Sequence, residues 1–416
     1  MMKYFLYLLL YLTSAIATAE SSDWLDNLQI HGFASQAFML TTDNDFYGDS
    51  DHGSAAYTEF GINSSLQLSS KFRVAGQLLS RNAGEMDNGS PRVDYALLDI
   101  NLISTMNGRL GAYLGRIKNP LGLYNDARDV AHTRQGIFSP QVIYFDKVRD
   151  LTISSDGIQL YGEYALPYGT LLFQGGAGYP IPDKNVEYAY LGQDWQGKLK
   201  GDNLAIVGRI MYEHDGGRWI FSASGASLEL DFNHRPADSA IPFIGITSGK
   251  VGIDYSVLSA QYNGEKWQFT SEMAIQDVEF ERLGGLFEDQ SNEPIAYMFE
   301  ANYKFTSKWQ SFLRYEVFYL DKGDKYGRQF NKDIQAGSNA ISFLSGGAIN
   351  VPVTPSYSRY SQSWVIGGRW DINKNLMART EFHWFDGTAI LSPRENDMTT
   401  AKRDWNLFAV SLSYRF

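Results

Sequence analysis

Apolar and polar residues alternate along most of this chain, and the period of two is that of a β-strand with one apolar face. The last twelve residues show the pattern most clearly: odd positions are mainly small or polar, whereas even positions are mainly apolar and include Phe408, Val410, Leu412, Tyr414 and Phe416. The same alternation recurs in segments 297–305, 311–319 and 377–384. Because helical periodicity is scarce, the sequence predicts an all-β protein.

The alternation predicts sixteen strands joined by connections that are short and long in turn. The strands are expected at 28–40, 57–68, 72–80, 94–103, 109–116, 157–165, 169–179, 204–213, 219–232, 249–262, 267–280, 295–305, 309–320, 361–372, 376–385 and 405–416. Seven connections are tight turns, at 69–71, 104–108, 166–168, 214–218, 263–266, 306–308 and 373–375. The other eight are long, at 41–56, 81–93, 117–156, 180–203, 233–248, 281–294, 321–360 and 386–404.

This order of connections separates the two ends of the sheet. Consecutive antiparallel strands run in opposite directions, so all short turns lie at one end and all long loops at the other. That is the layout of a transmembrane antiparallel 16-stranded β-barrel with short periplasmic turns and eight long external loops. Lipid cannot hydrogen-bond a bare strand edge, so the sheet must close. Sixteen strands enclose a lumen too wide for side chains to fill, so a water channel is expected.

Composition alone would suggest a soluble, acidic protein, because 44% of the 416 residues are hydrophobic and the net charge is −11. The alternation changes that picture, since only one face of each strand needs to contact lipid. The negative charge argues against nucleic acid as a partner. The absence of cysteine excludes disulfides, cysteine-ligated metals and a thiol nucleophile. Beyond the first 20 residues, no apolar run is long enough for a membrane-spanning helix.

The N-terminus has the pattern of a secretory signal. Lys3 supplies the positive end, residues 4–12 form a short apolar core, and Ala17-Thr18-Ala19 is a small-residue cleavage site. The alternative, a membrane anchor, fits less well because the apolar run is short. The sequence therefore predicts a signal peptide at 1–19 and a single barrel domain at 20–416.

These features together resemble Gram-negative outer-membrane porins over the whole mature chain. The strand and loop order carries the resemblance, and so does the terminal Tyr414-Arg415-Phe416. It implies a location in the bacterial outer membrane, contact with outer-membrane lipid and lipopolysaccharide, and a homotrimer. Tyr414 and Phe416 would be the signal read by the barrel-assembly machinery. The acidic Pro-Glu-Phe-Gly-Gly third loop of general enterobacterial porins is absent, so the subfamily and its charge preference stay open.

The resemblance also implies that segment 117–156 folds into the barrel and narrows it. Residues 116–150 contain four acidic and six basic residues, and the basic ones are the expected constriction residues Arg116, Lys118, Arg128, Arg134, Lys147 and Arg149. Charged groups at close quarters set ion preference. Alternatively, these residues form ion pairs that hold the loop in place.

Strand parity predicts which side chains line the pore wall. The expected wall residues are Arg73, Arg109, Glu300, Arg314, Glu316, Arg369, Arg379 and Glu381. Parity also places Glu229, Asp231 and Asp254 on the lumen face, with a slip within 222–229 that suggests a β-bulge near Gly225.

The function predicted from these features is passive diffusion of small hydrophilic solutes and ions through a water-filled channel. One alternative is a channel specific for phosphate-like anions or organic acids, with Arg116, Lys118, Arg128 and Arg134 as a ladder. Another is a structural or adhesive barrel that does not conduct.

Catalysis and cofactor binding are not expected. The sequence has no G-x-S-x-G nucleophile elbow, and His383 is predicted to be a polar wall residue. Asp43, Asp45 and Gly48 match part of a calcium-binding loop, but Tyr47 and Ser54 occupy positions where ligands are needed. The segment 43–51 is therefore expected to be a solvated acidic loop, and no metal is predicted.

Overall fold

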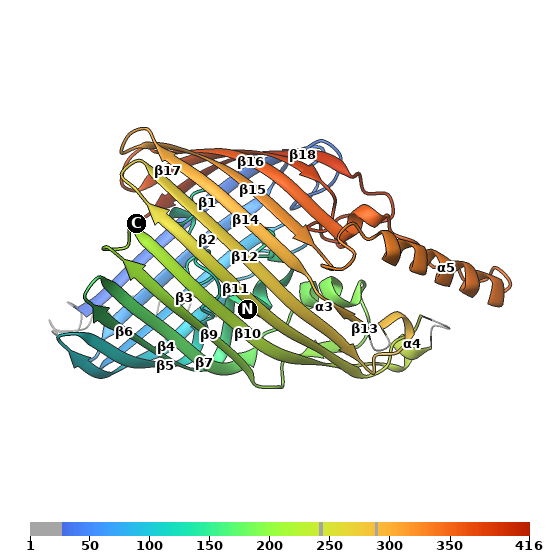
Figure 1. Cartoon of the computed structure of the whole chain (residues 1–416), viewed down its shortest axis with the longest axis horizontal. Helices are drawn as coiled ribbons and strands as arrows, with labels where there is room; N and C mark the ends of the chain where they lie inside the picture. The colour runs from blue at the N-terminus through green and yellow to red at the C-terminus, as the bar shows by residue number, and fades with distance from the viewer. Residues whose placement is uncertain (1–26, 241–243, 288–289) are drawn as a thin grey trace, which may run out of the picture.

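The computed structural model describes residues 27–240, 244–287 and 290–416, so the predicted signal peptide lies outside the described residues. Within these ranges, sixteen long antiparallel strands form one sheet (Figure 1). Their bounds are β1 (Leu28–Thr41), β2 (Ser54–Gln67), β3 (Phe72–Ala83), β4 (Arg92–Thr105), β5 (Gly108–Lys118), β6 (Ser154–Leu166), β7 (Gly169–Pro180), β9 (Ala205–His214), β10 (Trp219–Asn233), β11 (Gly249–Asn263), β12 (Trp267–Glu281), β14 (Ile295–Lys304), β15 (Trp309–Tyr319), β16 (Tyr360–Asp371), β17 (Leu376–Asp386) and β18 (Asp404–Arg415).

The sheet closes on itself, because β1 pairs with both β2 and β18. The β1–β18 ladder runs from Phe33 opposite Arg415 to Thr41 opposite Leu407. The predicted closed antiparallel barrel is therefore confirmed, and each predicted strand end lies within three residues of the observed one.

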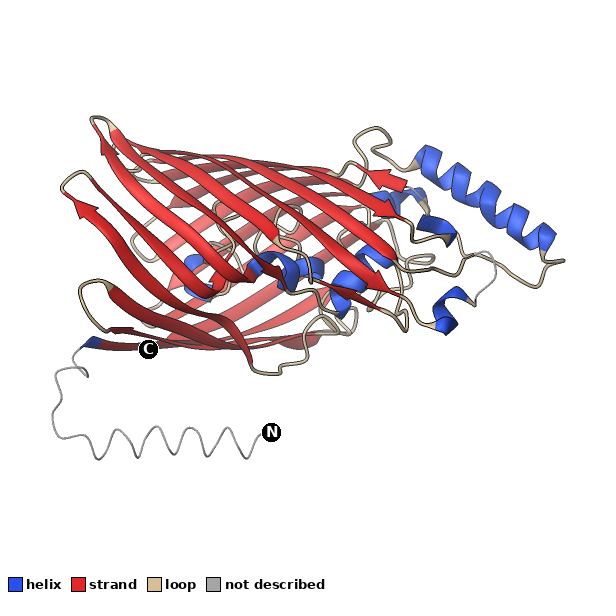
Figure 2. Ribbon diagram, turned by 90° about the horizontal axis from the view of Figure 1, so that it is seen from below, coloured by secondary structure: helices blue, strands red, loops and turns tan. Residues whose placement is uncertain are grey.

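The barrel has a turn end and a loop end (Figure 2). Both the start of β1 and the C-terminus lie at the turn end. The loop end carries short elements that the alternation did not predict: α3 (Lys184–Leu191), β8 (Lys198–Lys200), α4 (Pro236–Ser239), η4 (Gly285–Phe287), β13 (Gln290–Asn292), α5 (Arg328–Leu344) and η5 (Ser356–Arg359). The longest of them, α5, projects beyond the barrel (Figure 1). In the part of the chain that the structure describes, no helix is long and apolar enough to cross a membrane.

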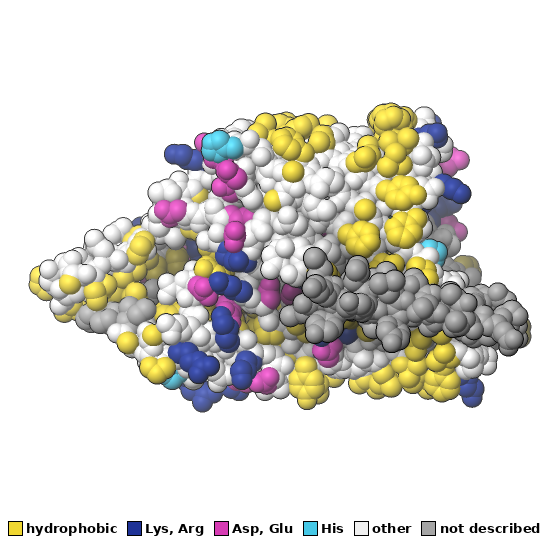
Figure 3. Space-filling model, turned by 180° about the vertical axis from the view of Figure 1, so that it is seen from behind, with side chains coloured by type: hydrophobic (Ala, Val, Ile, Leu, Met, Phe, Trp, Pro, Cys, Tyr) yellow, Lys and Arg dark blue, Asp and Glu magenta, His cyan; other side chains and the backbone are white. Residues whose placement is uncertain are grey.

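The outer face of the barrel is apolar toward the turn end. On β12, Trp267 and Ile275 point outward with 47% and 40% of their surface exposed, whereas Thr270 and Glu272 point inward and are buried. Figure 3 shows the opposite side of the barrel from the strands at the front of Figure 1, and apolar side chains gather toward the turn end there as well. A band of charged side chains crosses the same face nearer the end from which α5 projects (Figure 3).

At the loop end of β10–β12, the polarity of the two faces is reversed. Leu230 and Phe232 point inward and are fully buried, while Glu229 and Asp231 point outward. Asp254 lies on the outer face of β11 by the same register. The predicted lumen position of these three acids is therefore wrong. The predicted bulge near Gly225 is absent as well, since β10 pairs in continuous register with β9 and β11. The apparent slip in parity marks the position along β10 at which the outward-facing side chains change from apolar to polar.

Part of the lumen is filled by apolar side chains in two clusters. One cluster surrounds segment 117–156 and includes Phe138, Tyr144, Phe145, Phe318 and Trp405. The other lies at the loop end, where Leu230, Phe232 and Val251 pack against α3 and Trp195.

Candidate functional site

The segment between β5 and β6 enters the barrel and crosses it, and we call residues 119–153 the inward loop. It contains η2 (Ala131–Thr133), η3 (Asp146–Val148) and α2 (Arg149–Ile153), which lie inside the barrel (Figure 2). All residues from 136 to 146 are buried. The inward loop therefore occupies space inside the barrel between the strands that it contacts.

Hydrogen bonds attach the inward loop to the wall opposite its origin. Tyr144 donates its hydroxyl to Glu272 on β12, at 2.9 and 2.8 Å from the two carboxylate oxygens. Tyr255 on β11 donates to the carbonyl of Ile143 at 2.6 Å. On β17, Arg379 donates to the carbonyl of Ala131 at 2.9 Å. The loop is therefore held on several sides of the lumen.

Lys118, Arg134 and Arg149 are in ion pairs. Lys118 lies 2.6 Å from Asp94 of β4 and also contacts Asp129 of the inward loop. Arg149 contacts the same Asp129. All four side chains are at least 85% buried. Such pairs stabilise a fixed loop position and leave little free charge for a passing ion.

Arg134 pairs with Glu59 of β2, and nearby Arg81 of β3 lies 2.7 Å from Asp146 of the loop. Glu59 and Arg81 are 3.7 Å apart, which joins the two pairs into one network. Both strand residues are at most 2% exposed. Arg81 and Asp94 were not among the predicted site residues. Arg81 lies just outside the strand predicted at 72–80, and Asp94 is the first residue of the strand predicted at 94–103. The inward parity of Arg73 continues to Arg81 and was the available signal.

Arg128 and Lys147 lie in the loop without a carboxylate partner among the described residues. Arg128 is 1% exposed and donates to Thr152 Oγ1 at 3.1 Å, while its Nε and Nη1 have no hydrogen-bond partner in the described ranges. Lys147 donates to the carbonyl of Ala389 at 2.6 Å. Both residues contact the polar groups of neighbouring segments.

Arg116 is placed differently from the prediction. It lies on β5, opposite Asp156 of β6, and its Nε is 2.8 Å from the Asp156 carboxylate. Asp156 shares its parity with Ile158 and Leu160, whose side chains are 48% and 47% exposed on the outer face. The Arg116–Asp156 pair is therefore on the outside of the barrel, because the strand continues regularly to residue 118 and the loop begins only after it.

All eight predicted wall residues point into the barrel, and most are paired. Arg73 lies 2.8 Å from Asp99, Arg109 3.1 Å from Glu163, and Arg369 3.0 Å from Asp371. Arg314 bridges Glu300 and Glu316, at 2.8 and 3.1 Å. Glu381 accepts a hydrogen bond from the backbone N–H of Ile137 and lies 2.8 Å from His383. Arg379 instead binds backbone carbonyls of the inward loop.

A cavity of about 190 Å³ with charged, polar and apolar lining residues opens beside the inward loop toward the turn end, and we call it the polar cavity for its charged groups. Its lining includes Arg109, Tyr161, Gln174 and Arg209. Arg209 reaches the inward loop, where it lies 2.8 Å from Asp126 and donates to the carbonyl of Gly122 at 2.9 Å. This side of the lumen combines exposed charge with open space.

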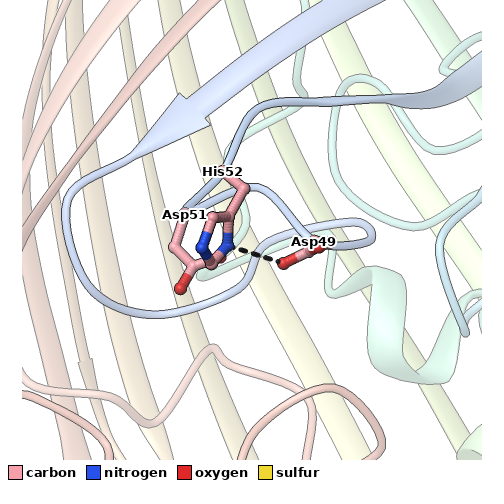
Figure 4. A group of neighbouring side chains, drawn as sticks. All are labelled: Asp49, Asp51 and His52. Atoms are coloured by element: carbon pink, nitrogen blue, oxygen red, sulfur yellow. Dashed lines mark hydrogen bonds and ion pairs between the residues drawn. The ribbon is translucent and has the colours of Figure 1, made fainter.

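The acidic first loop brings three possible ligands together (Figure 4). His52 Nδ1 lies 2.6 Å from Asp51 and 3.2 Å from Asp49, and the pKa of His52 is raised by these hydrogen bonds. The candidate ligand atoms lie within 4.8 Å of one another. All three side chains face solvent, and the interactions among them explain the geometry without a bound ion.

No family model matches this sequence, and no curated protein matches it. Solved structures do match in fold. The anion-selective porin from Comamonas acidovorans matches with a TM-score of 0.55 and 11% identity, over 94% of this chain and 99% of that chain. OmpT of Vibrio cholerae matches with a TM-score of 0.54 and 12% identity, over 96% and 99%.

The outer membrane channel DcaP of Acinetobacter baumannii matches with a TM-score of 0.52 and 15% identity, over 94% of this chain and 97% of that chain. The fold and the inward loop therefore define the class of structure: a closed 16-stranded barrel of the kind found in bacterial outer-membrane porins. The identities are too low to resolve a subfamily.

Proposed function

We propose that this protein is an outer-membrane porin through which small hydrophilic solutes and ions diffuse passively. The observation that carries the proposal is the inward loop, which crosses a closed barrel and is fastened to the opposite wall by Tyr144 and Glu272. A fixed loop in this position would limit the size of solutes that pass through the lumen, and this requires neither energy input nor a conformational change. The exposed charges of Arg109 and Glu163 on the turn side suit a hydrated path.

The proposed setting follows from the same architecture. The loop end faces the cell exterior and the turn end the periplasm. The charged band on the outer face lies where lipopolysaccharide headgroups would be, and segment 1–19 would direct export. Tyr414 and Phe416 would serve assembly, and a homotrimer is the proposed oligomer.

Weak charge selectivity fits the positions of the predicted constriction residues better than anion selectivity by a row of basic residues. Arg116 lies outside the barrel, and Lys118 and Arg134 are neutralised by buried carboxylates. The unneutralised Arg128 is almost fully buried. Selectivity is therefore assigned to the polar cavity that Arg109 and Arg209 line. His383 packs among wall residues beside Phe138 and Phe385, so it belongs to the wall rather than to a reaction centre.

A planar bilayer recording tests the proposed function. Purified protein reconstituted across a salt gradient should give stable conductance steps, in groups of three if the protein is a trimer. The reversal potential should be small and shift in direct response to charge changes at Arg109. Absence of conductance from correctly folded, heat-modifiable protein would instead support a structural or adhesive barrel.

A further inference from the structure

A second, larger cavity lies at the loop end, away from the polar path. It has a volume of about 240 Å³ and lies between α3, β12, β13 and the first turns of α5. Its walls are mainly apolar and aromatic, and include Tyr190, Val278, Phe280, Phe287, Phe330 and Ile334. Small-molecule sites in proteins have this kind of lining.

A small inner space of about 50 Å³ adjoins it, between the inward loop and the wall formed by β9–β11. Leu121, Ile143 and Phe145 line it from the loop side, and Leu228 and Ile253 from the wall. The two spaces share Tyr190 and Gln276 as lining residues, so they are neighbours. We call the two spaces together the apolar tract.

One positive charge is built into the outer cavity. Arg359 donates from Nη2 to Asn292 Oδ1 at 2.9 Å, and its guanidinium carbon lies 3.8 Å from the centre of the Phe330 ring. Within the described ranges no carboxylate comes within 4.0 Å of this guanidinium, and Asp321 and Asp324 act on it only at longer range. Burial lowers the pKa of Arg359 to about 10, so it remains charged at neutral pH.

Two further polar groups lie at the junction of the cavities. Neither the Tyr190 hydroxyl nor the Gln276 side-chain amide makes a hydrogen bond to the described part of the chain, although both line the cavities. Both residues are half-buried, so these polar groups are open to water and equally to a polar group of a ligand.

We propose that this tract binds apolar monocarboxylates in its outer cavity, with the carboxylate at Arg359 and the apolar body against the aromatic and aliphatic side chains between Phe330 and Phe280. An anion neutralises the guanidinium through charge-assisted hydrogen bonds. The aromatic and aliphatic walls remove the rest of the molecule from water. The proposal deepens the channel function on which it rests, since it names a solute class that would be captured at the loop end.

Direct binding tests the proposal without depending on conductance. Full-length protein in nanodiscs should bind 2-naphthoate saturably in isothermal titration, and 2-naphthol, which has the same rings without the charge, more weakly. Arg359→Gln should weaken 2-naphthoate binding about tenfold or more, because a hydrogen-bonded charge partner is lost. Arg328→Gln is the matched control, since Arg328 also lies over an aromatic ring, that of Tyr326, but does not line the cavity. Equal affinities in the two variants would overturn the proposal.

A second variant keeps the test independent of any structural role of Arg359. Ala189→Trp would fill the outer cavity from α3 and should abolish 2-naphthoate binding while the barrel keeps its heat-modifiable gel shift. Unchanged binding in this variant would overturn the proposal, as would native mass spectrometry that finds a lipid acyl chain in the tract. Binding without conductance would contradict the proposed channel function and support the carboxylate site. Conductance without binding would support the channel function and contradict the carboxylate site.

Discussion

Gly32 and Phe416 exchange two backbone hydrogen bonds, each 3.0 Å long, where the last strand meets the first. The Phe416 ring covers Gly32 so closely that a Cβ built on this glycine would lie 2.3 Å from ring atom Cζ. The final aromatic side chain therefore completes the closed sheet at a position that has room only for glycine.

Gly32→Ala should destabilise the barrel because the Phe416 ring must leave its position over residue 32, but this ring is 52% exposed, so the cost should stay below the roughly 1–3 kcal/mol of overpacking in a core. The melting of the heat-modifiable gel band measures the effect. Gly175→Ala is the matched control, since nothing lies within 4 Å of a Cβ at that strand position. In a Phe416→Ala background, the cost of Gly32→Ala should largely disappear; equal losses for both glycines would contradict the contact.

Asp146→Asn should loosen the inward loop. Asp146 accepts hydrogen bonds from Tyr47 and from Arg81, and removing its charge takes away the carboxylate nearest to the buried Arg81 guanidinium. Leaving a buried charge without any partner costs about 3–5 kcal/mol. The loss here should be smaller, because Glu59 at 3.7 Å and Asp87 at 3.9 Å remain near Arg81. Denaturant unfolding should show this loss, and single-channel records should show larger or noisier steps.

Asp126→Asn provides the comparison for Asp146→Asn. It removes the same charge from the same loop, but the Asp126 side chain is 31% exposed beside Arg209. Its effect on stability should be smaller than that of Asp146→Asn, because Asp126 is partly exposed and Arg209 keeps its hydrogen bonds to Gln174 and to the carbonyl of Gly122. A larger effect at Asp126 than at Asp146 would show that the buried network does not hold the loop.

Arg109→Gln and Arg116→Gln should differ in their effect on ion selectivity. Both arginines lie on β5 and pair with a carboxylate of β6, at 3.1 and 2.8 Å, but Arg109 faces the lumen and Arg116 faces outward. In a salt gradient, the reversal potential should therefore shift in the direction of greater cation selectivity in Arg109→Gln and stay unchanged in Arg116→Gln. A shift in the second variant alone would mean that the assigned faces are wrong.

The loop end should become less stable around α3 as pH rises. Burial, with a contribution from the charge of Asp150, raises the pKa of Asp183 to about 6, against 3.8 without the fold. The folded state therefore holds this proton between about pH 4 and 6, so stability falls across that window and is constant above it. Asp183 caps α3 by accepting from the Val186 N–H at 3.0 Å.

Hydrogen exchange of α3, corrected for intrinsic rates, measures this pH dependence. In Asp183→Asn the cap is kept, because asparagine is an equally good N-cap, but the titration is removed. The variant should therefore show equal protection at pH 4.5 and 7, whereas the natural chain should be better protected at pH 4.5. The same pH dependence in both proteins would assign it to another group.

The barrel was predictable from the sequence because its strands obey one local rule, and the closure of β18 on β1 follows from the need to satisfy backbone groups in lipid. The alternation of apolar and polar residues gave the wrong side for Glu229 and Asp231. It shows which residues share one face of a strand, but not whether that face contacts lipid, water or the barrel interior. The sequence analysis predicts a long loop at 321–360 and not α5, although Phe330, Ile334 and Ile341 have helical spacing. The alternation with a period of two identifies strands and does not detect a helix between them.

The candidate site was predictable only in part. Strand parity placed the side chains of Arg109 and Arg379 inside the barrel. This was possible because the face on which a side chain lies depends only on its position within its own strand. The pairing of Lys118 with Asp94 and of Arg134 with Glu59 depends on where a long loop crosses the lumen, and no local pattern encodes that distance. The cavity beside Arg359 likewise joins residues from four separate segments.

The reversal of polarity on β10 also limits how the protein can sit in a bilayer. The apolar outer face of β10 runs from Trp219 and turns polar at Ser227, whereas that of β15 continues from Trp309 to Tyr319. At about 3.4 Å per residue and a tilt near 40°, these spans match about 20 Å and about 26 Å of hydrocarbon. Such unequal heights are accommodated by a lean of the whole barrel or by local thinning of the lipid, so this protein would deform or tilt within a uniform membrane.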